Sequence, residues 1–561
     1  MNVTTSHNEG AAQGEQTLDG RAFLPNEVAA SRFLAQATFG ADFESIMEMS
    51  NTSYTEWLDA QFNTPKLFDI EQRVKDITEE TLDSVFAMGG NPNNVRPRLW
   101  YWHSAWWDYA MTSPDLLRQR IALALSEIFV VSEVPQLRET PLALANYYDV
   151  LLDNAFGNFR QLLADVTLHP AMGVYLTHIN NPKSNPAFNR FPDENYAREV
   201  MQLFTIGLYE LNPDGTKQLD SLGNFIPTYD NGDIAEFAKV FTGLSWGDSY
   251  AFGQNPLSEL SYTIPMKMYN AWHEPGEKHL LNGFTVPNRN PVNGLADLDD
   301  ALDNLFNHPN VGPFIGRLLI QRLVTSNPSH AYIGRVAAAF NNNGQGVRGD
   351  MKAVIRAILL DEEARDCGYI NSPYRGMLRE PIVRYAHVCR AFNAFSQKGI
   401  YRNTMDEFYT QVFQRPLASP SVFNFFQPDY RPIGPVDTAG LVAPEFQITN
   451  AVTITGYANR LYDWIMRADR AMEYRSNFTG EYRDDKNVNL QLDDELAFDE
   501  ISELGQLLER LNLILFHGQM SQATRQIIHA ALEQVPQNNW DIRVKMAIYL
   551  SMISPDYLIF R

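Results

Sequence analysis

The stretch SPDLLRQRIALALSEIFVVSE, residues 113–133, carries apolar side chains at intervals of three or four residues from Leu117 to Ile128. This spacing places them on one face of an α-helix. Ser113 is suited to cap the helix and Pro114 to be its first residue, because a proline at that position loses no amide hydrogen bond. The stretch therefore predicts a capped, half-buried helix.

The same pattern recurs along most of the chain, whereas strand patterns are scarce. Helical spacing also occurs at 142–155, 158–168, 194–209, 232–243, 311–325, 332–341, 351–360, 376–394, 442–467, 499–515, 520–534 and 541–553. The clearest strand signal is GTKQLDSLGNFIPTYD (215–230), in which SLGN predicts the turn of a hairpin. Long loops rich in Gly, Asn and Pro cover 178–193, 244–296 and 414–442. The sequence predicts a mainly α, large multi-helix globular protein with a small β-hairpin and long ordered loops.

The length of 561 residues allows about three domains or one large composite. Residues 1–24 are polar and Gly-rich, as in a flexible N-terminal tail. We expect a main helical domain at 25–474, a polar insert at 475–498, and a C-terminal helical segment at 499–561 that packs on the main domain.

The composition restricts the kinds of partner. With 45 Lys and Arg against 67 Asp and Glu, the net charge of −22 disfavours nucleic acid and anionic membrane surfaces. No apolar run approaches the ~18 residues of a membrane span. The two cysteines, Cys367 and Cys389, leave one disulfide open but cannot form a thiol-ligated zinc or iron–sulfur site. The first twenty residues do not resemble a signal peptide, so either the protein stays inside the cell or a leader is missing from this chain.

The most polar helical segment is PDENYAREVMQLF, residues 192–204. A helix there places Glu194, Asn195, Arg198 and Glu199 within one arc. This arc is either an ordinary solvated face, with Glu194 and Arg198 as an i,i+4 pair, or one wall of a cleft between the flanking loops. We favour the second alternative and expect Arg198 to be buried among carboxylates.

Histidine and tryptophan residues supply further candidates. His169, at a helix end before a proline, is expected to bond a backbone carbonyl, although a role as a ligand stays open. His273 and Lys278 share a loop rich in ionisable groups, and we expect them to lie near Glu199. Trp102 and Trp106 belong either to the core or to a face that stacks on a sugar.

No known catalytic or cofactor motif accompanies these residues. The chain contains no GxSxG, Walker A, GxGxxG or SxxK pattern in a suitable context and no HExxH metal motif. The sequence therefore leaves both the cofactor and the metal unknown.

Nine stretches, in order along the chain, resemble the bacterial domain-of-unknown-function 1800 (DUF1800) family. They are SRFLAQATFG, LRQRIALALSEIFVVS, NYYDVLLDNAFGNFRQLLADVTLHPAMGVYL, PDENYAREVMQLFTIGLYELNPDGT, IAEFAKVFTGLSW, FNHPNVGPFIGRLLIQRLVTSNPS, GVRGDMKAVIRAILLDEEAR, LREPIVR and SPSVFNFFQPDY. The residues at the family's signature positions are Glu194, Asn195, Arg198, Glu199, Thr242, Gly243, His273, Lys278 and Gly283. This chain departs from many relatives at Gln202 and Phe204, where they have an acid and a histidine, and at Leu244, where they have a tryptophan.

The resemblance implies a large helical bacterial protein that is commonly exported, hence periplasmic or secreted, with the cytoplasm as the alternative. It also implies a possible partner from the domain-of-unknown-function 1501 (DUF1501) family, but no established reaction. Two functions are compatible with these observations. The first is a binding or scaffold protein of the cell envelope or exterior that acts with a DUF1501-like partner.

The alternative function is a hydrolase acting on carbohydrate or cell-envelope material. Glu194 or Glu199 would then be the general acid or base, and Arg198 would hold an anionic group. His273 would be a second proton shuttle or a metal ligand. Asn195, Lys278, His169 and the tryptophans Trp102 and Trp106 would contribute to binding.

Overall fold

The computed structural model describes residues 25–365, 372, 374–396, 406–466, 474–475, 482–483, 488–536 and 538–561. The expected tail at 1–24, Cys367, and residues 476–481 and 484–487 of the expected insert lie outside these residues. Cys389 is buried.

The described chain is mainly helical, which confirms the predicted fold class. The helices are α2 (Pro25–Ala37), α3 (Phe43–Ser50), α4 (Tyr54–Asn63), α5 (Ile70–Ala87), η1 (Pro92–Asn94), α6 (Leu99–Thr112), α7 (Leu116–Ser126), α8 (Pro135–Arg138), α9 (Pro141–Asn154), α10 (Phe159–Leu168), α11 (Pro170–Tyr175), η2 (Pro186–Phe188), α12 (Asn195–Gln202), α13 (Asn231–Val240), η3 (Glu259–Thr263), η4 (Asn270–Trp272), η5 (Leu281–Gly283), α14 (Gly294–Phe306), α15 (Val311–Leu323), α16 (His330–Asn341), α17 (Met351–Leu359), α18 (Glu362–Arg365), α19 (Pro381–Ala391), α20 (Asp406–Val412), α21 (Pro435–Thr438), η8 (Pro444–Ile448), α22 (Ala451–Met466), α23 (Asp493–Leu496), η10 (Ile501–Glu503), α24 (Leu504–Phe516), α25 (Gln522–Glu533), α26 (Trp540–Ile553) and α27 (Pro555–Leu558).

Strands in the described residues are only two residues long and pair as antiparallel ribbons. The pairs are β1 (Leu244–Ser245) with β2 (Lys267–Met268), β3 (Lys278–His279) with β4 (Thr285–Val286), β5 (Met377–Leu378) with β8 (Ile559–Phe560), and β6 (Tyr474–Arg475) with β7 (Tyr482–Arg483). In the β5–β8 pair, Met377 lies opposite Phe560, so the last strand pairs with a segment far earlier in the sequence.

The helix predicted within residues 113–133 begins later than expected. It starts at Leu116 with Asp115 as its N-cap, so Pro114 precedes the helix. The Ser113 hydroxyl donates to the Asp115 carboxylate instead of capping the helix itself. Tyr109 donates to the same carboxylate, so Asp115 is fixed between the end of α6 and the start of α7.

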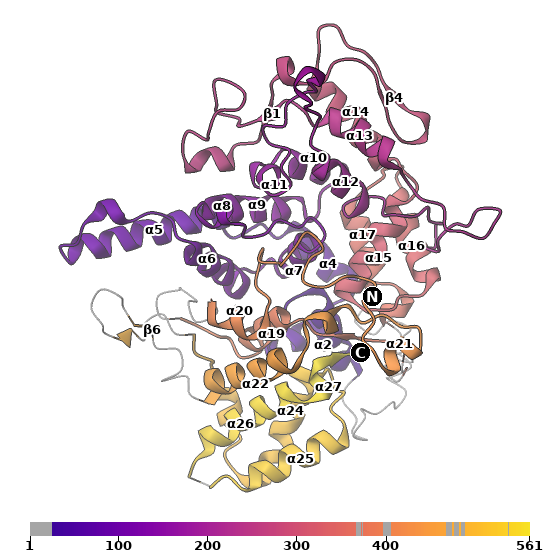
Figure 1. The fold of residues 1–561 in the computed structure, drawn as a ribbon. Coiled ribbons are helices and arrows are strands. Elements are labelled where there is room, and N and C mark those ends of the chain that lie inside the picture. The colour runs from indigo at the N-terminus through magenta and orange to yellow at the C-terminus, as the bar shows by residue number, and fades with distance from the viewer. Residues whose placement is uncertain are drawn as a thin grey trace.

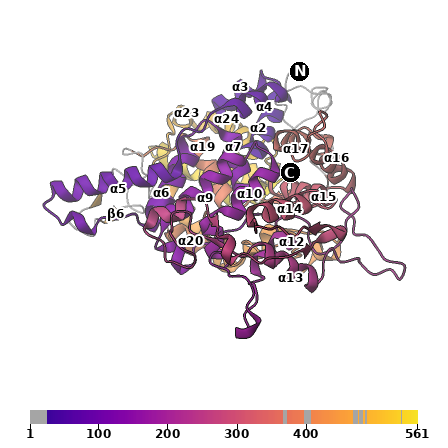
Figure 2. The ribbon, with the colours of Figure 1, turned by 90° about the horizontal axis from the view of Figure 1, so that it is seen from above.

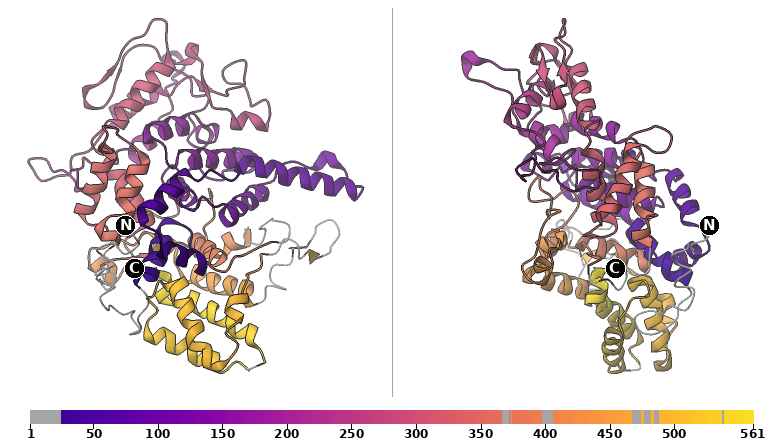
Figure 3. Two further views of the ribbon diagram at one scale, coloured as in Figure 1. Left: turned by 180° about the vertical axis from the view of Figure 1, so that it is seen from behind. Right: turned by 90° about the vertical axis from the view of Figure 1, so that its right-hand side faces the viewer.

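The helices form an elongated body (Figure 1; Figure 3). In the view of Figure 1, α13, α14, β1 and β4 lie at the top and the yellow C-terminal helices at the bottom. Helix α5 projects to one side, and Figure 2, from above, shows the same projection.

One continuous apolar core runs through α2 to α27, with a small second cluster around Phe425, Phe426 and Ile448. The C-terminal helix α24 packs on α2, α3 and α19, and α26 packs on α22. The Ser31 hydroxyl donates to the carbonyl of Leu513 at 2.6 Å, across 482 positions of sequence. The two ends of the described chain therefore share one core.

The predicted hairpin is present and is larger than the sequence indicated. Leu219 pairs with Phe225 around a turn in which the Asp220 amide donates to the carbonyl of Asn224. Further pairing of Tyr209 with Pro227 extends it to an arm at 208–228, which projects on the right of Figure 1.

Gly40, which follows α2, is a position where only glycine fits. Its φ is +120°, and a Cβ there would lie 2.2 Å from the His387 ring. Because this conformation is strained for any L side chain and the ring is buried, we expect Gly40→Ala to lower the free energy of unfolding by about 2–4 kcal/mol in a urea titration. Gly505→Ala in α24 is the control: nothing lies within 4 Å of the new Cβ. The substitution at Gly505 should be neutral or stabilise by up to ~1 kcal/mol, and equal effects at both positions would contradict the argument.

Candidate functional site

The polar arc of α12 is an exposed surface, which corrects the expectation that Arg198 is buried. The Arg198 Nη2 and Glu194 Oε2 atoms are 3.5 Å apart, and the two side chains are 41% and 47% exposed. Asn195 is exposed as well, and its backbone amide donates to the Asp193 carboxylate. The helix ends at Gln202 rather than at 209, so it is too short to form a deep wall.

Because an exposed ion pair gains little, Arg198→Ala should lower the free energy of unfolding by less than ~1 kcal/mol in a urea titration. The matched variant is Arg322→Ala, whose guanidinium is buried beside Glu127. The substitution at Arg322 should cost about 3–5 kcal/mol, because it leaves a buried carboxylate without its partner. A large loss for the Arg198 variant alone would restore the cleft hypothesis.

Glu199 points away from this surface and does not join His273. Its Oε2 atom is buried without a hydrogen-bond partner, and burial raises the pKa of the carboxyl group. Its electrostatic neighbours include Tyr175 and Tyr229. Within the described ranges, no hydrogen bond or ion pair connects Glu199 with His273 or Lys278, so the expected common site is not formed by direct contact.

His273 and Lys278 do come together, through a residue that the sequence argument missed. His273 Nε2 lies 3.1 Å and Lys278 Nζ 2.5 Å from Asp297 Oδ2, while Arg289 binds the other carboxylate oxygen. Burial alone would raise the pKa of Asp297, but the hydrogen bonds from Lys278 and His273 hold it below its usual value. All of these charges are mutually engaged, so neither His273 nor Lys278 is available to a ligand.

Thr242 and Gly243 are in close contact with the loop that carries His273 and Lys278. Gly243 has φ +86°, and a Cβ there would lie 2.9 Å from the His273 amide nitrogen. The Thr242 carbonyl lies 2.9 Å from His273 Nδ1, and the Thr242 hydroxyl accepts from the Glu274 amide. These signature residues therefore join the loop to α13 and α14.

The remaining predicted binding residues lie inside the protein. Trp102 and Trp106 are 0% and 2% exposed and pack around Tyr148, so neither ring offers a face to a sugar. His169 is buried; its Nδ1 accepts from the Ala171 amide, and burial lowers its pKa to about 3. The core interpretation of the tryptophans is correct. His169 bonds a backbone amide and lies 2.9 Å from Asn146 Oδ1, not beside the expected backbone carbonyl.

The strongest concentration of buried charge lies elsewhere, where five segments meet. We define the central charge cluster as Arg120 of α7, Glu127 directly after α7, Arg322 of α15, Glu380 before α19, Gln414 after α20 and Glu445 of η8. All six are buried, at 1–6% exposure. A group of ionisable residues so far from solvent is unusual and is typical of either a functional site or a structural junction.

Two carboxyl groups share one amide in this cluster. Gln414 Nε2 donates to Glu380 Oε2 at 2.7 Å and lies 3.3 Å from Glu127 Oε1. Arg322 Nε is 2.8 Å from the other oxygen of Glu127. Burial raises the pKa of Glu127 well above its usual value, and the nearby carboxyl group of Glu380 raises it further. A like charge near a buried carboxyl group disfavours its ionised form, as burial does.

Glu445 adds a third acid to this arrangement. Both of its carboxyl oxygens are buried without a hydrogen-bond partner in the described residues, and burial raises its pKa to about 8. Burial also lowers the pKa of Arg120, whose Nη2 donates to the carbonyl of Arg322.

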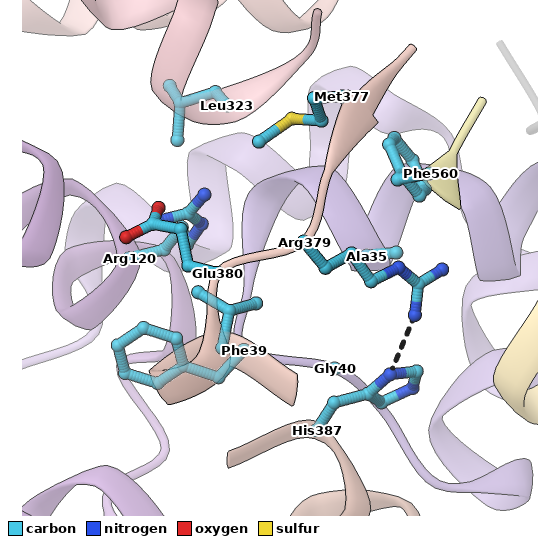
Figure 4. Close-up of a pocket in the computed structure, with 11 residues that line it drawn as sticks. Ala35, Phe39, Gly40, Arg120, Leu323, Met377, Arg379, Glu380, His387 and Phe560 are labelled. Atoms are coloured by element: carbon cyan, nitrogen blue, oxygen red, sulfur yellow. Dashed lines mark hydrogen bonds between the residues drawn. The ribbon is translucent and has the colours of Figure 1, made fainter. Parts of the chain in front are cut away.

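The space beside the cluster is small. Arg120 and Glu380 face one cavity of about 20 Å³, together with Arg379 and His387 (Figure 4). Glu127 and Gln414 face a second cavity of about 10 Å³. Each has room for about one water molecule. A water can reach the carboxyl groups, but a sugar or peptide cannot.

Further charged residues lie on two sides of the central charge cluster. Glu133 accepts from Arg415 and lies 2.6 Å from His103 Nε2. On the other side, Arg379 donates to the rings of His387 and His517. No group of three or more His, Cys, Asp or Glu suited to hold a metal ion occurs in the part of the chain that the structure describes.

Sequence reasoning missed the cluster, although its signal is visible. Glu127 interrupts the apolar run ALSEIFVV, and Arg120 lies seven residues earlier on the same helix face. A charge inside an apolar run is costly unless it has a partner. The stretch LREPIVR, which contains Glu380, was noted only as a family likeness.

The fold and this cluster define a large helical protein whose main ionic site is closed to large ligands. The chain belongs to the DUF1800 family, described as a protein of unknown function, whose model matches residues 32–559. Neither the comparison with curated proteins nor that with solved structures gives a match. Within the described ranges, no helix is both long and apolar enough to cross a bilayer.

The raised pKa of Glu445 predicts a pH-dependent effect of Glu445→Gln. In the folded state the carboxyl keeps its proton up to about pH 8, whereas the unfolded chain releases it above the usual value of 4.5. The protonated group therefore stabilises the fold fully below pH 4.5, and this contribution is lost as pH rises to about 8. Relative to the variant, the wild type should lose up to about 1.4 kcal/mol for each pH unit in this window.

Urea titrations of both proteins from pH 5 to pH 8.5 measure this difference. Glu79→Gln, on an exposed position of α5, is the control and should show a small difference that does not vary with pH. A constant difference for Glu445→Gln would mean that the carboxyl is solvated.

Proposed function

We propose that this protein is a binding or scaffold protein, and that it binds its partner through exposed aromatic side chains on its long loops. The observation that carries the proposal is the aromatic loop surface, which we define as Phe188, Phe191, Phe252 and Trp272. Phe188 and Phe191 are 82% and 65% exposed, and Trp272 is 38% exposed. Arg190, between the two phenylalanines in the sequence, lies over the Trp272 ring at 6.0 Å, so the loop that carries them runs beside Trp272. Exposed apolar side chains on neighbouring loops are typical of interaction sites.

The backbone under this surface is held in place before any partner binds. Glu274 accepts from both the amide and the hydroxyl of Ser184, at 2.6 and 2.7 Å. The Lys183 amide donates to the carbonyl of Trp272, and the Trp272 and Phe252 rings stack at 4.8 Å. A surface that is already ordered loses little conformational entropy on binding.

The arm at 208–228 offers a second contact. Leu222, in its turn, is 84% exposed, and Leu219 and Phe225 are at least half exposed. The turn is rigid because the Asp220 carboxylate accepts from the amides of Leu222 and Asn224. Ordered apolar tips are suited to insert into a partner's groove.

The proposed location and partner rest on the family resemblance. We propose a place in the cell envelope or outside the cell, in the periplasm or secreted, and a DUF1501-like protein as the partner. The excess of acidic residues supports a protein partner over nucleic acid. The hydrolase alternative has less support, because the predicted acids Glu194 and Glu199 face different surroundings. A carbohydrate partner would have to stack on Trp272 rather than on Trp102 or Trp106.

The test is co-purification of the full chain with a DUF1501-family protein encoded beside it, followed by titration calorimetry. The double variant Phe188→Ser, Trp272→Ala should weaken binding at least about 100-fold, because anchors of this kind carry about 2 kcal/mol or more each. Ile527→Ser is the matched control, since Ile527 is 69% exposed on the distant α25. Equal affinity for the double variant and the wild type would refute the assigned surface, and no complex would refute the assigned partner.

A further inference from the structure

Arg379 is a buried cation with no acidic partner. It is 6% exposed, and its Nη1 and Nη2 atoms donate to His387 Nδ1 at 3.0 Å and His517 Nε2 at 2.7 Å. Its guanidinium also lies over the rings of Tyr557 and Phe560. In the described ranges no carboxylate forms an ion pair with Arg379. Buried charges are normally paired, so this arrangement lacks an anion.

The two histidines do not supply negative charge, and their bonding keeps them neutral. His517 Nε2 accepts from Arg379, so its proton lies on Nδ1, which is 2.7 Å from Ser31 Oγ. The Ser31 hydroxyl in turn donates to the carbonyl of Leu513 at 2.6 Å. Burial lowers the pKa of His387 to about 3 and also lowers that of His517. The positive charge therefore stays on Arg379.

A cavity of about 100 Å³ lies against this guanidinium. It is lined by Arg379, Phe516, His517, Gln519, Pro555, Asp556, Ile559 and Arg561. Arg32, close to the cavity, donates from its Nε to the backbone oxygen of Arg561, the last residue of the sequence. The volume is room for several water molecules, and it exceeds that of both cavities beside the central charge cluster.

The polar atoms around this cavity suit an anion. Gln519 Oε1 is buried without a hydrogen-bond partner in the described residues, so the amide group is free to turn its NH₂ inward. Asp556 is the one acid among the lining residues, and its Oδ2 already accepts from the Ser521 amide at 2.9 Å. In the described ranges no carboxylate pairs with Arg379, so its charge remains to be balanced at this cavity.

We propose that this cavity is a binding site for a small oxyanion, such as phosphate or the carboxylate group of a small metabolite. Arg379 and Arg561 would donate charge-assisted hydrogen bonds to its oxygens, and Gln519 would add an amide donor. The site is separate from the aromatic loop surface and does not depend on the function proposed above.

Isothermal titration of the full chain with inorganic phosphate tests this site, with sodium chloride adjusted to keep the ionic strength constant. We expect saturable binding of one phosphate per chain and a rise of the unfolding temperature with phosphate. Sulfate and acetate are titrated in the same way. Tighter binding of phosphate and sulfate would assign a tetrahedral anion, and tighter binding of acetate a carboxylate.

Three variants locate the binding. Arg379→Lys removes the planar fork but also alters a buried position, so Arg561→Ala, at an exposed residue, is the second variant. Each should weaken binding at least about tenfold, the loss expected for one charge-assisted hydrogen bond. Arg138→Ala, on the exposed surface of α8, should leave the affinity unchanged. The proposal is overturned if the wild type shows no saturable binding, or if Arg561→Ala binds as tightly as Arg138→Ala.

Discussion

The ion pair between Arg322 and Glu127 is the interaction on which the arrangement of the helices depends. Its two side chains are 4% and 3% exposed, so each charge is tolerated only in the presence of the other. Gln414 extends the pair to Glu380 and thereby fixes the residue after α20 against α7 and α19. Apolar contacts alone would allow these segments to shift relative to one another, whereas separating a buried charge from its partner is costly. We regard the central charge cluster as the element that specifies the packing.

Local features of the fold were predictable from the sequence because they depend on near neighbours. The helical periodicity and the turn around Asp220 are properties of a few consecutive residues, and both are present. The helix starting at Leu116 shows the limit of this reasoning. Ser113 and Pro114 form a typical start signal, but Ser113 is the C-cap of α6, and its hydroxyl donates to Asp115.

The site was less predictable, because its residues meet only in three dimensions. Glu127 and Gln414 are 287 positions apart, and no spacing rule connects them. The prediction that Arg198 is buried failed for the opposite reason. Glu194 and Arg198 form a good local pair, but nothing packs over them. His273 and Lys278 meet at Asp297. Asp297 lies in α14, a helix that the sequence pattern did not predict, directly after the stretch 244–296 that was assigned to a loop.

The hydrogen bond from Ser31 to Leu513 has a consequence for how the chain is made. Helix α2 is synthesised first, but its partner α24 follows 482 residues later. At about 5–20 residues per second, the ribosome needs roughly half a minute to a minute and a half to cover that distance. During this time α2 can pack on α3, and Phe33 on Tyr54 and Trp57 of α4, but the part of α2 that contacts α24 has no native partner. That part of its surface is covered only when the last helices emerge, and a chain shortened at its C-terminal end would keep it exposed.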